Sequence, residues 1–295
     1  MRAASRRQLP LRWRPLRRTF SASGSDNTPD CTASRGADDG APPASTHFGF
    51  ETVSSQEKTE RVKGVFHEVA AQYDVMNDAM SGGVHRLWKR QLVAQLRPSA
   101  GMRVLDLAGG TGDIAFRVAE AAPGAALTVC DPTSSMLAEG QRRAEERGLR
   151  GIEWQEAPAE TLPFADGAFD AVTMSFGMRN VTRVPQALRE IRRVLAPGGR
   201  FMCLEFCMPQ NAAAAQLYDA YSFNVIPRLG EAIVGDSAPY QYLVESIRQW
   251  DGAQPARFAG MLRDAGYGEV SFETQQPLGI VAIWSGWQFG PAVEA

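Results

Sequence analysis

The residues best suited to chemistry in this 295-residue chain gather in the segment VLDLAGGTGD, residues 104–113. Gly109, Gly110 and Gly112 follow a short apolar run, and glycines at such a place let the backbone turn tightly and approach a ligand closely. Asp131 ends a second apolar run about 20 residues later, where a carboxylate can accept both ribose hydroxyls of an adenosine. The spacing therefore predicts a site for a nucleoside-containing ligand.

Two other interpretations of these glycines compete with that one. Gly110, Gly112 and Ala115 also have the spacing of the dinucleotide fingerprint G-x-G-x-x-A, which indicates NAD. A purely structural tight turn is the third interpretation. A dehydrogenase needs a second mononucleotide-binding half, whereas the residues after this motif predict further strands, an insertion and a closing hairpin. That arrangement favours a cofactor with one nucleoside and a substrate bound beside it.

The glycine-rich segment lies within a regular alternation of apolar runs and helical patterns. Such alternation predicts a parallel sheet with helices on both faces and right-handed crossovers. The predicted strands are residues 102–108, 126–131, 151–157, 169–176 and 200–206, and the predicted helices between them are 113–121, 135–147 and 185–195.

Further elements flank this alternation. Helical spacing of apolar residues predicts helices at 56–70 and 84–96 before it, and a helix at 256–265 after it. Residues 268–274 and 279–287 read as strands joined by a connection of hairpin length. The predicted fold is thus α/β and Rossmann-like, a doubly wound, mostly parallel sheet that ends in an antiparallel hairpin.

The sequence resembles the C-methyltransferases of ubiquinone and menaquinone biosynthesis from about Phe66 to Trp287. The resemblance implies the class I fold of S-adenosylmethionine-dependent methyltransferases, with S-adenosyl-L-methionine as cofactor and no metal. It also implies methylation of a ring carbon of 2-methoxy-6-polyprenyl-1,4-benzoquinol. Methylation of a naphthoquinol, or a non-catalytic subunit that binds the cofactor, are the alternatives. The segments that carry the resemblance are YDVMND (73–78), VLDLAGGTGD (104–113), LPF (162–164), SFGMRNVT (175–182), VLAPGGRFMCLEF (194–206), YDAYSFNVIPRLG (218–230) and YLVESIRQW (242–250).

Carried over position by position, the resemblance implies a set of cofactor contacts. One of them departs from the family, which usually has Asn or Asp at position 158, where this chain has Pro158. Proline offers neither a side-chain hydrogen-bonding group nor an N–H, so the Ala159 N–H is expected to serve the adenine. The implied contacts are Asp106, Gly109, Gly110, Thr111, Gly112, Asp131, Pro158, Ala159 and Ser175.

The resemblance also suggests residues that act on the substrate. Arg179 and Asn180 follow the fourth strand, at the edge where α/β sheets bind ligands. Arg179 is a candidate to stabilise a phenolate, with a structural salt bridge as the alternative, and Asn180 to orient a water. Tyr73 is a third candidate. His85 lies on a predicted helix without a partner motif, which favours a surface or packing role.

An insertion at 207–254 interrupts the alternation after the fifth strand. Its aromatic and aliphatic side chains predict a tunnel for a polyprenyl tail or a surface that rests on a membrane, with plain core packing as the alternative. These residues are Tyr218, Tyr221, Phe223, Val225, Ile226, Tyr240 and Tyr242.

The N-terminal segment differs in composition from the rest. Residues 1–20 hold seven arginines and no acid, which is typical of an organellar presequence, mitochondrial ahead of plastid. A basic tail without an address is the alternative. Residues 21–46 read as a disordered linker, and residues 47–289 as the methyltransferase domain.

Charge and hydropathy limit the partners. Without the seven arginines the formal charge falls from −2 to −9, which argues against nucleic-acid binding. No apolar run approaches the length of a membrane span. The resemblance implies a peripheral enzyme on the matrix side of the mitochondrial inner membrane, within a multi-subunit ubiquinone-synthesis complex. It leaves a homodimer open.

Overall fold

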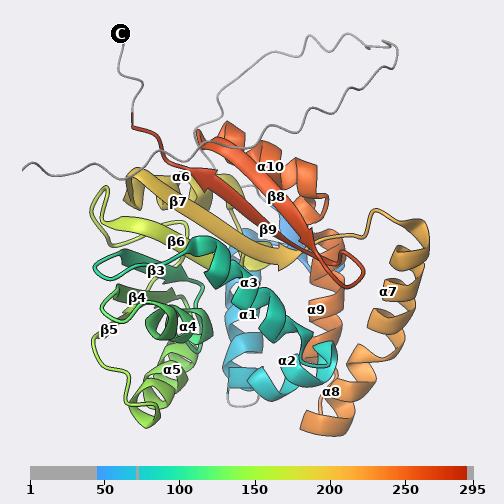
Figure 1. Cartoon of the computed structure of the whole chain (residues 1–295). Helices are drawn as coiled ribbons and strands as arrows, with labels where there is room; N and C mark the ends of the chain where they lie inside the picture. The colour runs from blue at the N-terminus through green and yellow to red at the C-terminus, as the bar shows by residue number, and fades with distance from the viewer. Residues whose placement is uncertain (1–44, 71–72, 291–295) are drawn as a thin grey trace, which may run out of the picture. The chain divides into compact units, whose positions relative to one another are not determined.

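A computed structural model describes residues 45–70 and 73–290, apart from the side chains at 74 and 234. Its main feature is a seven-stranded sheet with the order β5-β4-β3-β6-β7-β9-β8 (Figure 1). The first five strands of this order run parallel, and β9 pairs antiparallel with both β7 and β8. The strands are β3 (Arg103–Leu107), β4 (Ala126–Asp131), β5 (Ile152–Glu156), β6 (Phe169–Ser175), β7 (Leu195–Phe206), β8 (Gly268–Gln275) and β9 (Val281–Trp287). The predicted sheet, including its antiparallel end, is confirmed.

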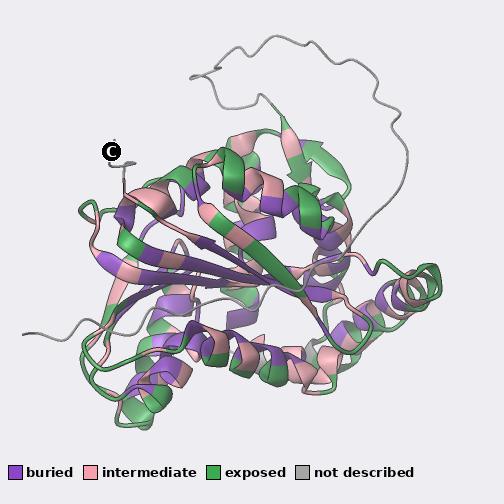
Figure 2. Cartoon of the chain, turned by 45° about the horizontal axis from the view of Figure 1, so that its top comes forward, coloured by how far each residue is buried: buried purple, intermediate pink, exposed green. Residues whose placement is uncertain are grey.

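Helices cover both faces of this sheet because its strands are apolar on both faces. On one face, Leu105 and Met174 pack with α6 (Val184–Val194) and α10 (Pro255–Asp264). On the other, Val104 and Leu204 pack with α3 (Val84–Leu96) and α4 (Asp113–Ala121). Figure 2 shows the central strands buried between helices whose outer sides are exposed, whereas the edge strand β8 is mostly exposed or half-buried.

The helix that follows β4 packs against that strand and against α4, close to the glycine-rich loop. This helix, α5 (Ser134–Glu146), packs Leu137 against Val129 of β4 and Ala115 of α4. The chain order changes direction between β3 and β6, which lie side by side although two strands separate them in sequence. At such a point the loops at the carboxyl ends diverge and leave a crevice.

Helices outside the alternation surround that crevice. The insertion forms α7 (Ala212–Asn224), α8 (Ile226–Val234), α9 (Ala238–Gln249) and the short 3-10 helix η3 (Asp251–Ala253). Another short 3-10 helix, η2 (Met178–Asn180), follows β6. Before the sheet come α1 (Ser55–Val69) and α2 (Tyr73–Ser81), and α2 contacts α8. The Ser54 side chain caps α1 by accepting from the Glu57 N–H.

Two features near the start of the described chain differ from the expected pattern. A small hairpin of β1 (Thr46–Phe48) and β2 (Glu51–Val53) was not predicted, since three-residue strands give no periodicity to read. Thr46 therefore belongs to a strand and not to the predicted linker. The rest of that linker, up to residue 44, and the predicted presequence lie outside the described residues. No helix among the described residues is long and apolar enough to cross a membrane.

Candidate functional site

The loop between β3 and α4 has a backbone that only its glycines allow. Gly110 and Gly112 have φ of +54° and +80°, in the left-handed region that favours glycine. Gly109 has no such angle, but a Cβ there would lie 2.8 Å from both the Asp106 carbonyl oxygen and Val129 Cγ1. The loop is therefore pressed against the ends of β3 and β4, with its backbone exposed to the crevice.

Asp106 positions this loop from beneath. Its Oδ2 accepts from the Ala115 N–H at 3.1 Å, and its Oδ1 accepts from the Thr173 hydroxyl at 3.1 Å. Burial raises the pKa of Asp106 to about 7, against the lowering effect of these two hydrogen bonds. Asp106 thus ties β3, β6 and the first turn of α4 together, while it also lines the cavity above.

Asp131 ends β4 beside the same loop. Its Oδ2 accepts from the Gly110 N–H at 3.0 Å and its Oδ1 from the Thr133 N–H at 2.9 Å. Desolvation raises the pKa of this carboxyl to about 6. Each carboxylate oxygen has a second lone pair, so the pair can still accept from two hydroxyls of a ligand.

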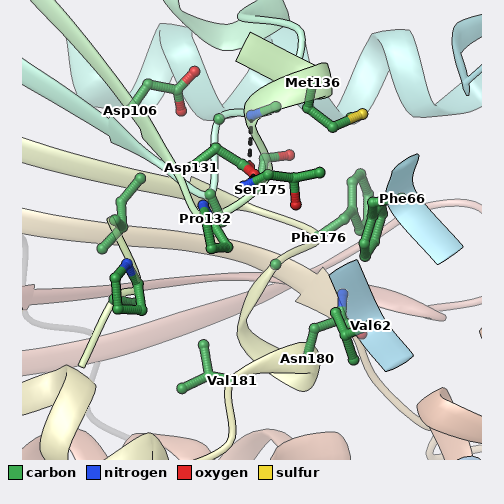
Figure 3. Close-up of a pocket in the computed structure, with 18 of the residues that line it drawn as sticks. Val62, Phe66, Asp106, Asp131, Pro132, Met136, Ser175, Phe176, Asn180 and Val181 are labelled. Carbon is green, nitrogen blue, oxygen red and sulfur yellow. Dashed lines mark hydrogen bonds between the residues drawn. The ribbon is translucent and has the colours of Figure 1, made fainter. Parts of the chain in front are cut away.

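These groups line one cavity, which we call the first cavity. Its strand side holds Asp131 and Ser175, and α1 faces them with Val62 and Phe66 (Figure 3). The Ser175 hydroxyl is buried and has no hydrogen-bond partner among the described residues. An unpaired buried hydroxyl in a cavity wall is expected to bind a polar group of the ligand. Glycine loop, carboxylate and hydroxyl together fit an adenosine-containing ligand.

The other predicted cofactor contacts also reach this wall. Thr111, Pro158 and Ala159 line the first cavity together with Gly109 and Gly110, whereas Gly112 lies behind the lining. A Cβ at Gly112 would lie 2.9 Å from the Trp154 ring. The structure thus gathers the predicted set around one cavity, and their contact with the cofactor stays a prediction.

Helix α1 closes the first cavity from above. The Lys58 ammonium donates to the Val181 carbonyl at 3.3 Å, and the Thr59 hydroxyl lies 3.2 Å from that of Thr182. Thr59, Val62 and Phe66 line the cavity from successive turns of one helix face. Helix α1 thus forms one wall of the ligand site.

A second cavity of about 470 Å³ adjoins the first. Phe66, Tyr73, Lys89 and Phe176 line both, so the two form one continuous site. The wall of the second cavity is mostly apolar and comes from α2, α3, α7 and α9. Five of the seven residues predicted for a tail tunnel line it, namely Tyr218, Tyr221, Ile226, Tyr240 and Tyr242. The other two, Phe223 and Val225, are exposed.

Arg179 lines the second cavity and is held in a buried ion pair. Its Nη1 lies 3.0 Å from Glu205 Oε1, and the two side chains are 5% and 0% exposed. The same nitrogen donates to the Phe176 carbonyl, and the guanidinium lies over the Phe206 ring. The structural salt bridge anticipated as the alternative is therefore present. Because the ion pair fixes Arg179 in the wall, it remains placed to face a substrate oxygen.

Asn180 and Tyr73 lie at the junction of the cavities. Asn180 lines the first cavity, and its Oδ1 accepts from the Tyr242 hydroxyl of the second cavity at 3.0 Å. Tyr73 packs its ring against Phe66 at 6.1 Å. Burial raises the pKa of Tyr242 to about 12, so it stays a proton donor toward Asn180. The three predicted substrate residues thus surround one junction, and their catalytic roles stay predictions.

Sequence reasoning did not include Lys89 in this site and favoured a surface or packing role for His85. Lys89 is buried at the junction, 2.9 Å from Asp113, and its charge lowers the pKa of Asp113 to about 2 against strong desolvation. His85 is 7% exposed and lines the second cavity. His85 and Lys89 lie one helical turn apart in HRLWKR, residues 85–90, and this spacing places them on one helix face. That shared face was the signal in the sequence that could have linked them.

Comparison with known proteins gives the family. A model described as the ubiE/COQ5 methyltransferase family matches residues 54–288. A relative from Paracoccus denitrificans, named ubiquinone/menaquinone biosynthesis C-methyltransferase UbiE, is 53% identical over 247 residues, which are 83% of this chain and 98% of that protein. A relative of the same name from Bradyrhizobium diazoefficiens is 52% identical over 252 residues, 84% of this chain and 98% of its own.

Solved structures agree in fold. A chain from the complex between the Haloferax volcanii Trm112 methyltransferase activator and a methyltransferase has a TM-score of 0.54 at 18% identity, covering 76% of this chain and 98% of its own. An N-methyltransferase from Haemonchus contortus, in complex with S-adenosylhomocysteine, has a TM-score of 0.52 at 14% identity, covering 68% and 52%. These likenesses show the class I methyltransferase fold.

Proposed function

Because the chain belongs to the ubiE/COQ5 methyltransferase family, we propose that it methylates a ring carbon of a polyprenyl benzoquinol in ubiquinone biosynthesis. It is an S-adenosylmethionine-dependent C-methyltransferase by family and fold. The observation that carries the choice of substrate is the second cavity, which is large, apolar and continuous with the cofactor cavity. A quinol ring with an isoprenoid tail matches that lining, with the ring at the junction and the tail among the tyrosines.

S-adenosylmethionine supplies an electrophilic methyl group on a sulfonium. Asp131 would bind the ribose hydroxyls, and the glycine loop would let the amino acid part approach the backbone. The reacting charges, phenolate and sulfonium, neutralise each other, so a site that excludes water favours the transfer. Helix α1, which covers one side of the first cavity, would reduce the access of water to the bound reactants. Holding methyl and ring carbon near contact distance contributes on the order of 7–11 kcal/mol at best.

The ring of the substrate is expected to meet polar groups at the junction of the two cavities. Arg179 faces the second cavity with its charge balanced by Glu205, which lets it stabilise a phenolate oxygen without adding net charge to the wall. Asn180, oriented by Tyr242, would position the ring or a water. A naphthoquinol offers the same ring chemistry, and the relatives carry the name of both pathways. We prefer the benzoquinol because the composition of residues 1–20 is that of a mitochondrial presequence.

We place the enzyme on the matrix side of the mitochondrial inner membrane. The support is the arginine-rich, acid-free segment 1–20, which has the composition of a mitochondrial presequence. The tail of the substrate supports peripheral membrane contact, as do exposed apolar side chains on α7, on α8 and at the residue between them, namely Leu217, Phe223, Ile233 and Val225. A multi-subunit ubiquinone-synthesis complex and a homodimer stay predictions.

Calorimetric titration of the full chain with S-adenosylmethionine, and separately with NADH, tests the cofactor. We expect binding of the first alone, with Asp131→Ala abolishing it. The ring product is then tested by incubating the enzyme with methyl-labelled cofactor and either a short-chain benzoquinol or a naphthoquinol under reducing conditions. Label in the benzoquinol supports the proposal, and label in the naphthoquinol alone contradicts it. Cofactor binding without any transfer would indicate the non-catalytic subunit.

A further inference from the structure

Methylation at a quinol ring carbon requires a base that accepts the hydroxyl proton. No carboxylate lines the second cavity among the residues that the structure describes, and His85 is the one imidazole there. The four carboxylates that line the first cavity all have partners within the protein, Asp106 and Asp131 through the hydrogen bonds described above. Asp113 pairs with Lys89, and Glu160 accepts from the Thr182 and Arg183 N–H groups.

The neighbours of His85 fix its tautomer. The Ser81 hydroxyl lies 2.7 Å from the Asn77 carbonyl oxygen, which can only accept, so its single hydrogen points there. The Ser81 oxygen also lies 2.8 Å from His85 Nδ1 and must therefore accept from it. This arrangement favours the tautomer that carries the ring hydrogen on Nδ1 and the lone pair on Nε2.

The charged groups around the imidazole of His85 have opposing effects on its pKa. Burial lowers the pKa of His85, and the nearby positive charge of Lys89 lowers it further, whereas Asp78 and Asp113 raise it and Arg86 adds a small lowering effect. Asp78 Oδ1 lies 3.8 Å from Nε2, too far for a hydrogen bond but close enough to stabilise an imidazolium. Both oxygens of Asp78 are held by Arg86.

We propose that Nε2 of His85 is the general base that takes the hydroxyl proton from the quinol in the second cavity. The proposal rests on the proposed function. Arg179 and Asn180 lack this capacity, because a guanidinium does not deprotonate in proteins and an amide is not a base. His85 lines the second cavity one helical turn from Lys89, which lines both cavities.

The step balances without a further reactant. Nε2 takes the proton from the quinol oxygen, and the resulting electron pair moves through the ring to form the bond between the ring carbon and the methyl group. The bond between methyl and sulfur breaks, and its electron pair stays on sulfur. The ring carbon then loses its own hydrogen as a proton, the ring regains aromaticity and the oxygen regains its hydrogen. One proton leaves through His85.

His85→Asn tests the base by activity, since its amide can keep the donation to Ser81 but has no basic nitrogen. We expect kcat to fall by about 10²–10⁴-fold, with the affinity for S-adenosylmethionine within about twofold. The kcat of the wild type should rise with pH through a pKa below about 6.5, because only neutral imidazole accepts a proton, and His85→Asn should lose this limb. The control is His67→Asn, exposed on α1, which should leave kcat and the limb unchanged.

A kcat of His85→Asn within about tenfold of the wild type, with the acidic limb retained, would overturn the proposal. Nitrogen NMR of the ¹⁵N-histidine-labelled full chain tests it without turnover. We expect Nδ1 protonated and Nε2 unprotonated at pH 7, and the opposite tautomer would overturn it too. A wild type that binds cofactor but methylates no quinol would instead contradict the proposed function.

Discussion

At the scale of single residues, the first cavity combines groups with satisfied and unsatisfied hydrogen bonds. Asp106 and Asp131 each accept two hydrogen bonds from the protein, so they hold the loop whether or not a ligand is bound. Ser175 has no partner among the described residues. Its hydroxyl gains a hydrogen bond only from a ligand, and this makes it a sensitive probe of the site.

Replacing Ser175 by alanine should weaken cofactor binding without weakening the fold. The lost hydrogen bond is worth about 0.5–1.5 kcal/mol, or roughly two- to twelvefold in Kd. The apo protein should be equally or more stable, because an unpaired buried hydroxyl is removed. The control is Ser135→Ala, which deletes another unpaired hydroxyl that lies outside the cavity lining. Calorimetry that showed equal losses for the two variants would refute the contact.

Because the pKa of Asp106 is raised to about 7, its negative charge should destabilise the folded protein at higher pH. A carboxyl whose pKa is higher in the folded than in the unfolded state stabilises the fold below about pH 4, and this is lost as pH rises through 7. Asp106→Asn keeps an acceptor for the Ala115 N–H, and its amide can donate to Thr173. Between pH 5 and pH 8 the variant should gain on the order of 2–4 kcal/mol relative to the wild type.

Urea unfolding of the apo proteins at both pH values measures this gain. Asp131, whose pKa is also raised, contributes equally to both proteins and cancels in the difference. If the difference in free energy of unfolding between variant and wild type does not change with pH, ionisation of Asp106 does not destabilise the fold.

At the scale of elements, close packing of helices onto the loop and the cavity decides where side chains fit. Gly140 of α5 lies beneath the loop, where a Cβ would come 2.5 Å from the Trp154 ring and 3.1 Å from the Thr111 carbonyl carbon. Gly64 of α1, by contrast, has open space around the position of a Cβ. Close packing thus requires glycine at position 140, whereas packing does not require it at position 64.

Alanine at these two positions should have opposite effects. Gly64→Ala should stabilise the protein by about 0.5–1 kcal/mol, because glycine costs that much inside a helix. Gly140→Ala should destabilise it by about 1–3 kcal/mol through overpacking and should weaken cofactor binding by displacing Thr111. Thermal unfolding and calorimetry check both. Equal shifts in melting temperature would contradict the packing argument.

At the scale of the whole molecule, the second cavity lies next to an apolar part of the surface. Leu217 of α7 lines that cavity and is also 59% exposed. Ile233 of α8 and Val75 of α2 are exposed as well, and α2 contacts α8. Large exposed apolar side chains gathered over neighbouring elements mark surfaces that bind partners or membranes. A substrate with an isoprenoid tail would enter from such a surface.

The double variant Leu217→Asp with Ile233→Asp should bind uncharged phosphatidylcholine vesicles at least tenfold more weakly than the wild type. Each substitution removes about 1.5 kcal/mol or more of apolar burial and adds a charge that resists transfer from water. Cosedimentation measures the partition. Leu87→Asp is the control, since Leu87 on α3 is 46% exposed, close to the 45% of Ile233, and should leave the partition unchanged. Equal losses would exclude α7 and α8 as the contact.

The sequence by itself determined the α/β alternation, the glycine loop, Asp131 and the family. Periodicity, glycine spacing and strand ends are local properties, and the parallel fold brings the strand ends to one edge whatever the helices do. Only the tertiary structure decided which side chains meet across the chain. Arg179 pairs with Glu205, Tyr242 with Asn180, and His85 enters the cavity wall, because packing joins elements that no local pattern relates.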